Sequence, residues 1–280
     1  LSSIILSNSV TSIGDSIFFQ CISLSSIKLT KNVAFIGDGA FYGCNKLKEI
    51  TVSSKNPYFK SVDGFLFNKN GSKLIRYLPN KKEASYQVPD YVKSIENYAF
   101  MDCKSLSSIT LSNSVTSIGR SAFSYCRSLS SINLSNSLIS IGRSAFWGCY
   151  SLLSITLPNG VISIGDSAFW SCRSLLSITL PDSLTSIGKL AFSDCSSLPS
   201  LILPKNVVFI GDGAFYACFK LKGITVNPEN PYFKSVDGVV FTKDDNKLIY
   251  DPSAGLVDYD VEFWVNILNY IISTTYHFTA

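Results

Sequence analysis

Eight cysteines are the side chains best suited to chemistry in this chain of 280 residues. They are Cys21, Cys44, Cys103, Cys126, Cys149, Cys172, Cys195 and Cys218, mostly 23 residues apart. Zinc sites use closely paired cysteines, usually with histidine nearby, and neither feature is present. In a regular stack of coils the thiols would lie near disulfide distance, but their side chains would point in parallel. We therefore interpret them as a column of small buried thiols, ahead of a disulfide ladder or a metal site.

Groups for acid-base or nucleophilic catalysis are few. The single histidine, His277, is the fourth residue from the end of the sequence, so no Ser-His-Asp or Cys-His arrangement is expected. The recurring phrase IGDGAF lacks the lysine of a phosphate-binding loop. Asp63-Gly64 and Asp237-Gly238 lack EF-hand spacing, and we interpret them as turn residues. The sequence predicts a protein that is not an enzyme and uses no metal or cofactor.

Charge and hydropathy argue against two further classes of protein. The net charge of +4 is small and its basic residues are scattered, unlike the basic stripe of a nucleic-acid-binding domain. No apolar run reaches the ~18 residues that a membrane-spanning helix needs. Because 46% of the residues are hydrophobic, the chain can still build a core. We expect no nucleic-acid partner and no membrane insertion.

The cysteines recur because the sequence is built on a period of 23 residues. Five consecutive blocks run from Leu106 to Lys220, with apolar residues at block positions 1, 4, 6, 10, 13, 17, 18 and 21, and glycine at position 14. A fixed period of this size indicates a solenoid. We expect one domain over residues 1–280. It comprises plain repeats at 1–46 and 106–220, insertion-bearing repeats at 47–105 and 221–261, and a degenerate end at 262–280.

An insertion of 36 residues interrupts the period and occurs twice. Residues 31–67 and 205–241 are identical at 28 of 37 positions, at a constant offset of 174 residues. Asn70-Gly71 between two apolar runs predicts a β-hairpin in the first copy. We expect two hairpin arms whose aromatic side chains form a second candidate binding surface. These side chains are Tyr58, Phe59, Phe65 and Tyr77 on one arm, and Tyr232 and Phe233 on the other.

The pattern within one block predicts two extended pieces and a short helical return. Positions 4 and 6 point to one side and positions 3 and 5 to the other, as in a strand whose outer face carries Ser, Thr and Asn. Between positions 14 and 21, the spacing of Ala122, Phe123 and Cys126 fits one or two helical turns. The predicted fold is a repeat solenoid of α/β type with mostly short β elements.

Residues 175–197 show the repeat in its fullest form, LLSITLPDSLTSIGKLAFSDCSS. This phrase resembles the pattern LxxIxLPxSVTSIGxxAFxxCxx of the BspA-like class of leucine-rich repeats, and the likeness extends over residues 1–261. The resemblance implies a leucine-rich-repeat array. It also implies a surface or secreted protein that adheres to host proteins or cells, since family members are commonly of that kind.

Tryptophan, tyrosine and arginine gather near the return of the central blocks. These residue types dominate binding hot spots, and we expect them to contact a partner. The candidate residues, called the ridge below, are Tyr125, Trp147, Tyr150, Trp170, Arg120, Arg127, Arg143 and Arg173. The alternative is that the rings lie flat over the neighbouring coil and only shield the core.

The expected function is protein recognition at a cell surface, as an adhesin or receptor-like ectodomain engaging a host or matrix protein. Two alternatives are a structural spacer without a binding site and a module that binds polysaccharide or ice through the Ser/Thr face. The chain begins inside a repeat, so we expect a piece of a longer array. Exposed core at its ends indicates end-to-end self-association of the fragment.

Overall fold

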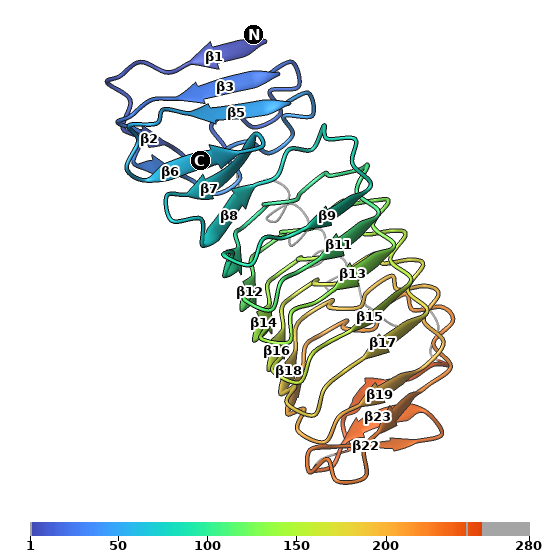
Figure 1. Ribbon diagram of the computed structural model, residues 1–280. Helices are drawn as coiled ribbons and strands as arrows, with labels where there is room; N and C mark the ends of the chain where they lie inside the picture. Colours follow the sequence, from blue (N-terminus) through green and yellow to red (C-terminus); the bar gives the residue numbers. More distant parts are fainter. Residues whose placement is uncertain (1, 245, 254–280) are drawn as a thin grey trace.

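Each plain 23-residue block forms one coil that contributes short strands to two sides of the solenoid (Figure 1). In the block that starts at Leu106, the strands are β11 (Ser108–Thr110) and β12 (Ser117–Ile118). Side chains alternate along β11, because Ile109 is buried and Thr110 is exposed. The predicted polar outer face of this strand and the predicted solenoid are therefore confirmed.

The strands of successive coils pair in parallel with a register of one block. The first strands are β1 (Ser3–Ile5), β3 (Ser26–Leu29), β5 (Glu49–Val52), β9 (Ser85–Gln87), β11, β13 (Ser131–Asn133), β15 (Ser154–Thr156), β17 (Ser177–Thr179), β19 (Leu201–Leu203) and β21 (Ile224–Val226). The second strands are β2 (Ser12–Ile13), β4 (Phe35–Ile36), β10 (Ser94–Ile95), β12, β14 (Ser140–Ile141), β16 (Ser163–Ile164), β18 (Ser186–Ile187) and β20 (Phe209–Ile210). Because Ile109 lies opposite Ile132, identical block positions become neighbours in successive plain coils.

The predicted helical return is wrong, because the chain makes consecutive turns there. Backbone φ is positive at block positions 16 and 20, for example 52° at Ser121 and 57° at Tyr125, which a right-handed helix does not allow. The amide of Ala122 donates to the carbonyl three residues back at 3.3 Å, whereas that of Phe123 donates to Ala145 of the next coil at 2.8 Å. Amides thus alternate between a local turn and the neighbouring coil, and the described residues contain no helix.

Two columns of identical side chains fill the core behind the returns. Phe169 is fully buried and stacks on Phe146 at 5.2 Å and on Phe192 at 5.4 Å between ring centroids. The predicted thiol column is confirmed, since seven of the eight cysteines are buried, Cys21 is half-buried and all are free. The Cys172 thiol donates to the carbonyl of Phe146 at 3.3 Å. The thiols are therefore held by weak hydrogen bonds to backbone carbonyls, and they are not joined to one another by disulfides.

Thiol reactivity is expected to separate Cys21 from the other cysteines. Burial raises the pKa of Cys44 to about 11 and that of Cys218 to about 12, which lowers the thiolate fraction available for alkylation. Mass spectrometry after brief iodoacetamide treatment at pH 8 should find one adduct on the native protein and eight on the denatured protein. Rapid alkylation of Cys172 in the native protein would contradict its burial.

The first insertion is built into the stack and does not project as an arm. Strands β6 (Phe59–Val62), β7 (Phe65–Asn68) and β8 (Lys73–Arg76) form an antiparallel meander. The predicted hairpin is confirmed, since Asn70-Gly71 joins β7 to β8. Strand β8 also pairs in parallel with β10, so that the insertion continues the second-strand sheet.

Four of the six aromatic side chains predicted to form a second binding surface belong to the core, which corrects the prediction of two aromatic arms. Phe59, Phe65, Tyr77 and Phe233 are buried, whereas the other two predicted residues, Tyr58 and Tyr232, are exposed. The second insertion repeats the meander with β22 (Phe233–Val236), β23 (Val239–Thr242) and β24 (Leu248–Tyr250).

One aspartate in each insertion, Asp63 or Asp237, occupies a tight turn. Asp63 and Gly64 connect β6 to β7 with φ of 52° and 83°, and Asp237 and Gly238 connect β22 to β23 with φ of 51° and 82°. Two consecutive positive φ values are the conformation of a type I′ hairpin turn, which favours Asp-Gly. The interpretation of these residues as turn formers is confirmed.

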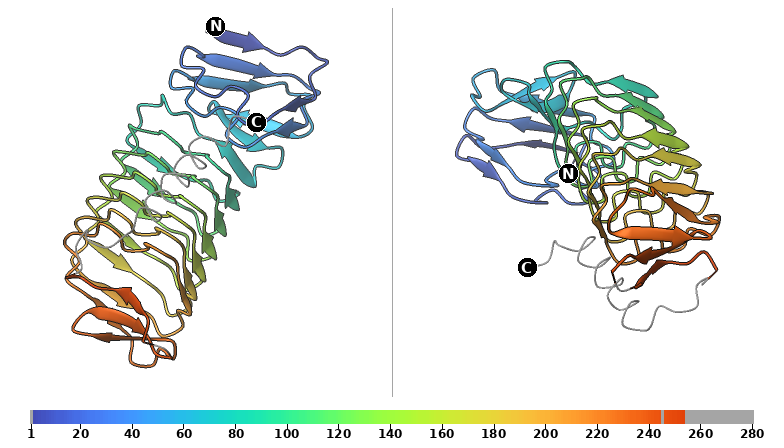
Figure 2. Two further views of the ribbon diagram at one scale, coloured as in Figure 1. Left: turned by 180° about the vertical axis from the view of Figure 1, so that it is seen from behind. Right: turned by 90° about the horizontal axis from the view of Figure 1, so that it is seen from below.

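The computed structural model describes residues 2–244 and 246–253, so the degenerate end at 262–280 and His277 lie outside it. The first-strand sheets β1-β3-β5 and β9-β11-β13 are separate, with the first insertion between them. Figure 2 shows the N-terminal coils meeting the longer stack at this interruption. Within the described ranges, no helix is long and apolar enough to cross a membrane.

Candidate functional site

Trp147 and Trp170 occupy block position 19 in adjacent coils, beside the return. Their ring centroids are 5.2 Å apart and their planes differ by 8°, while Tyr125 lies 5.0 Å from Trp147 on the other side. All three side chains are half-buried. Stacking of the two coils brings the tryptophans into register, and Tyr125, at block position 20 of the preceding coil, extends the row by one ring. Each of the three rings is partly covered by the coil and partly exposed to solvent.

A second row, at block position 22, alternates arginine and tyrosine. The guanidinium carbons of Arg127 and Arg173 lie 5.6 Å and 5.4 Å from the ring centroid of Tyr150, and Arg127 also lies 5.8 Å from that of Tyr125. These distances fit cation–π contacts. Both arginines are exposed, so the row presents positive charge held between rings.

Gly148 makes room for this arrangement. It lies in the left-handed region with φ of 70°, and a Cβ placed on it would lie 2.8 Å from the ring of Tyr125. A larger residue would therefore be strained and would push the tyrosine away from Trp147. The close packing of the two rows depends on a glycine at this position.

Two of the eight ridge residues lie apart from these rows. Arg120 stacks over Tyr98 at 5.3 Å and forms an ion pair with Asp38 at 3.1 Å, which places it at the junction with the N-terminal coils. Arg143 is half-buried. Burial raises the pKa of Tyr98, and the positive charges of Arg120 and Arg143 partly oppose this rise. Six ridge residues thus come together, whereas Arg120 lies at the junction with the N-terminal coils.

The electrostatics of the two rows are set by burial and by one acidic neighbour. Burial raises the pKa of Tyr125, so that its phenol stays neutral. Asp194 accepts a hydrogen bond from Nε of Arg173 at 2.8 Å, and this bond raises the pKa of the arginine. The surface therefore offers neutral rings, the charge of Arg127 and a partly offset charge on Arg173.

Asp194 is a member of this surface that was not predicted from the sequence. The signal was available in the register, because Asp194 occupies block position 20 of the coil after Arg173. Parallel stacking brings such residues together although they are 21 residues apart in the chain. The described residues contain no group of three or more His, Cys, Asp or Glu side chains arranged to hold a metal ion.

Comparisons with solved structures identify bacterial repeat proteins of the same architecture. A leucine-rich cell surface protein of Faecalibacterium prausnitzii is 31% identical, with a TM-score of 0.62, over 75% of this chain and 59% of that one. A leucine-rich repeat protein of Eubacterium ventriosum is 26% identical, with a TM-score of 0.64, over 77% of this chain and 64% of that one. The pneumococcal vaccine antigen PcpA is 27% identical, with a TM-score of 0.60, over 90% of this chain and 61% of that one.

The match thus spans less than two thirds of the length of each of these proteins. No curated protein matches the chain in sequence. A family model described as "BspA type Leucine rich repeat region (6 copies)" matches residues 1–79, 76–176 and 116–246. The chain is a repeat scaffold and belongs to the BspA-type leucine-rich repeat family.

Proposed function

We propose that the protein is a non-catalytic binding scaffold that recognises a partner protein at a cell surface through the two rows of the ridge. The observation that carries the proposal is the continuous surface of Tyr125, Trp147 and Trp170 beside the Arg127–Tyr150–Arg173 row. Rigid aromatic rings flanked by arginine lose little entropy on binding and provide both apolar contact and charge. An acidic partner surface would complement the exposed guanidinium of Arg127.

The surface location is proposed from similarity. The Faecalibacterium prausnitzii protein is named as a cell surface protein, and PcpA as a vaccine antigen. A solenoid suits adhesion because its coils hold side chains from distant sequence positions in one rigid, extended surface. We infer that this chain serves as the recognition part of an adhesin or receptor-like ectodomain.

Replacing Trp147 and Trp170 together with alanine is expected to weaken partner binding at least about thirtyfold, because truncating a hot-spot tryptophan commonly costs 2 kcal/mol or more. Binding is measured by flow cytometry on epithelial cells and by titration onto immobilised fibronectin and laminin. Circular dichroism and thermal melting check that the variant stays folded.

Tyr232→Ala is the matched control, because Tyr232 is an exposed aromatic residue of the second insertion, 51% accessible, away from the ridge. It should bind as the parent does. Loss of binding in Tyr232→Ala with full binding in the double variant would move the site to the insertions. Absence of saturable binding to cells and matrix proteins would instead favour a structural spacer.

A further inference from the structure

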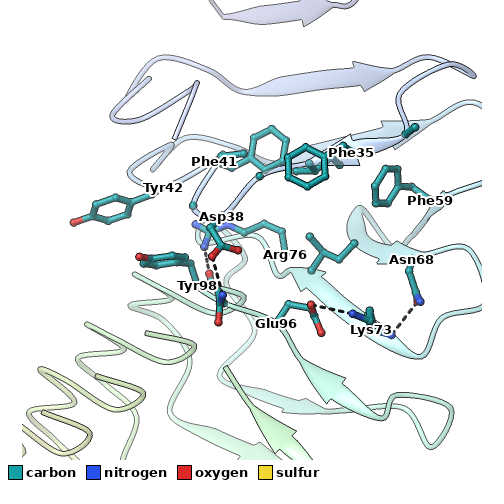
Figure 3. A pocket seen from close by; sticks show the side chains of 17 residues that line it. Phe35, Asp38, Phe41, Tyr42, Phe59, Asn68, Lys73, Arg76, Glu96 and Tyr98 are labelled. Atoms are coloured by element: carbon teal, nitrogen blue, oxygen red, sulfur yellow. Dashed lines mark hydrogen bonds and ion pairs between the residues drawn. The ribbon is translucent and has the colours of Figure 1, made fainter. Parts of the chain in front are cut away.

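A cleft of about 230 Å³ lies where the N-terminal coils meet the first insertion (Figure 3). Its walls come from residues 34–42 around β4, from strand β8, and from residues 96–98 of the next return. Phe35, Phe41 and Ile75 give it an apolar lining. None of the six residues that form the two rows contributes to it, so the cleft is a separate feature.

Arg76 lines this cleft and is only 3% exposed. Its Nη1 donates to the carbonyl of Tyr98. Among the described residues, Nε and Nη2 have no hydrogen-bond partner, and these two nitrogens form the edge that binds a carboxylate side-on. Burying charged donors without acceptors destabilises the fold. An oxyanion at this edge would remove that destabilisation.

Backbone donors on the facing wall also lack acceptors. In the preceding coil, the amides of Ser16 and Phe18 each donate to the next return at 3.0 Å. The equivalent amides of Gly39 and Phe41 donate to no group among the described residues, because the insertion separates this coil from the next return. In the insertion, the amide of Tyr77 donates to the carbonyl of Ala99 in the next return at 2.8 Å, which is the hydrogen bond that Phe41 would otherwise make. Gly39 and Phe41 line the cleft together with Arg76, so its lining residues carry unpaired donors of both backbone and side chain.

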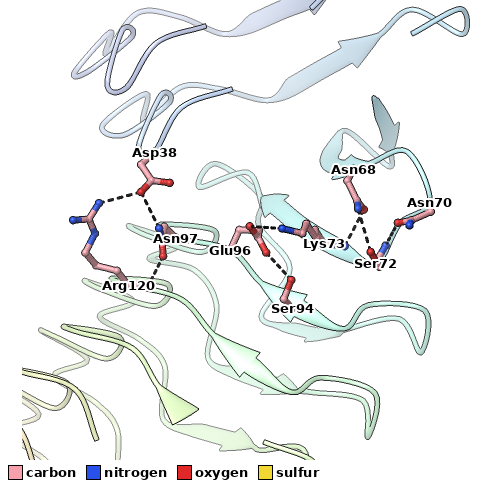
Figure 4. A network of polar contacts seen from close by, with 9 residues as sticks. All are labelled: Asp38, Asn68, Asn70, Ser72, Lys73, Ser94, Glu96, Asn97 and Arg120. Carbon is pink, nitrogen blue, oxygen red and sulfur yellow. Dashed lines mark hydrogen bonds and ion pairs between the residues drawn. The ribbon is translucent and has the colours of Figure 1, made fainter. Parts of the chain in front are cut away.

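The other charged side chains of the cleft are already paired (Figure 4). Asp38 contacts Arg120 at 3.1 Å, and Glu96 contacts Lys73 at 3.5 Å. In the described part of the chain, no carboxylate forms an ion pair with Arg76. The cleft therefore carries one positive charge that nothing in direct contact compensates.

We propose that this cleft binds the carboxylate of a small organic acid. A planar carboxylate fits the Nε–Nη2 edge of Arg76 with two parallel hydrogen bonds, and the amides of Gly39 and Phe41 are further donors. The apolar wall around Phe35 takes the hydrocarbon part of the ligand. Because both nitrogens are covered, binding must shift a neighbouring side chain, and we expect the half-buried Tyr98 ring beside Gly39 to move. The proposal does not depend on partner binding by the ridge.

The second insertion supplies a matched control variant. At the offset of 174 residues, Tyr250 corresponds to Arg76. The hydroxyl of Tyr250 donates to the carbonyl of Leu221 at 2.7 Å, so the equivalent strand accommodates tyrosine at this position. Arg76→Tyr is therefore expected to preserve the fold while removing the binding edge. Arg76→Lys keeps the charge but loses the side-on geometry.

The test titrates the ¹⁵N-labelled protein with benzoate, acetate and inorganic phosphate, and follows the amides of Gly39 and Phe41 and the Nε–H of Arg76 by NMR. Benzoate should shift all three signals saturably and bind more tightly than acetate or phosphate. Arg76→Tyr should weaken benzoate binding at least about tenfold, as loss of charge-assisted hydrogen bonds predicts, and Arg76→Lys should also weaken it.

Absence of saturable shifts in the parent protein would overturn the site. Unchanged benzoate affinity in a folded Arg76→Tyr variant would overturn the role of the arginine. Tighter binding of phosphate than of benzoate would overturn the assignment to organic carboxylates.

Discussion

Replacing Phe169 with alanine is expected to lower the free energy of unfolding by about 3–5 kcal/mol, the largest single-residue effect we anticipate in this chain. The side chain is completely buried and stacks against rings on both sides, with interplanar angles of 6° to Phe146 and 2° to Phe192. Truncation therefore removes apolar burial, leaves a cavity and breaks two aromatic contacts at once. Urea denaturation followed by circular dichroism measures the loss.

The neighbouring Trp170→Ala variant is the control, because the tryptophan is half-buried and its ring lies at the surface. It should lower the free energy of unfolding by much less, about 1 kcal/mol. Equal destabilisation by the two variants would show that the outer row, and not the phenylalanine column, holds adjacent coils together.

The position of Phe169 within the stack adds a second expectation. Each coil of a solenoid contacts only its neighbours, so its stability depends on local interfaces. A weakened interface in the middle of the array should separate the unfolding of the coils before it from that of the coils after it. A broader or two-step denaturation curve for Phe169→Ala, compared with the parent, is the expected sign.

The sequence predicted the columns of the core because the repeat is in register. Once Ile109 and Ile132 share a block position, parallel pairing alone makes them neighbours, and the same holds for the cysteines and for Trp147 and Trp170. The alternation of buried and exposed residues in β11 followed from the two-residue period of a strand. These features depend on spacing only, and spacing is visible in the sequence.

The returns show where spacing is ambiguous. Apolar residues at block positions 17, 18 and 21 fit one face of a helix, and they equally fit consecutive turns that point the same side chains inward. The deciding feature is positive φ at positions 16 and 20, where glycine is found in only some coils. Leu190 adopts φ of 55° at position 16, so residue type alone does not reveal the conformation. Hydrogen bonding between coils imposes it.

The burial of Arg76 also lay beyond sequence reasoning. In an isolated hairpin, the alternation of side chains along the strand would decide which face Arg76 takes, and both faces of a single strand pair are open to solvent. Strand β8 instead pairs with β7 on one side and with β10 on the other, so that it is an interior strand of the sheet. Tertiary pairing, and not the hairpin signal, decides which of its side chains are covered. The cleft exists only because the insertion meets the coil of β4 there.

Replacing Asn56 with alanine is expected to destabilise the first insertion strongly, because its buried side chain joins the insertion to the preceding coil. Nδ2 donates to the carbonyls of Thr30 at 2.8 Å and Val33 at 2.9 Å, and Oδ1 accepts from the amides of Tyr58 and Phe59, both at 2.8 Å. Alanine leaves these backbone groups without their partner, and a loss of about 3 kcal/mol is expected. Hydrogen exchange should show faster opening of β6, β7 and β8.

Two further variants separate this hydrogen-bond network from the general effect of losing an asparagine. Asn133→Ala removes an exposed side chain of the outer strand face and should change the free energy of unfolding by less than about 0.5 kcal/mol. Asn56→Asp keeps both acceptor contacts but turns a second oxygen toward two carbonyls. Burial and these carbonyls favour the protonated acid, so its pKa should rise above the unfolded value. The free energy of unfolding of Asn56→Asp should therefore increase as the pH falls from 7 toward 5. Asn56→Ala has no carboxyl group at this position and should not show this increase. Identical pH profiles for the two variants would show that the carbonyls of Thr30 and Val33 do not require a donor from residue 56.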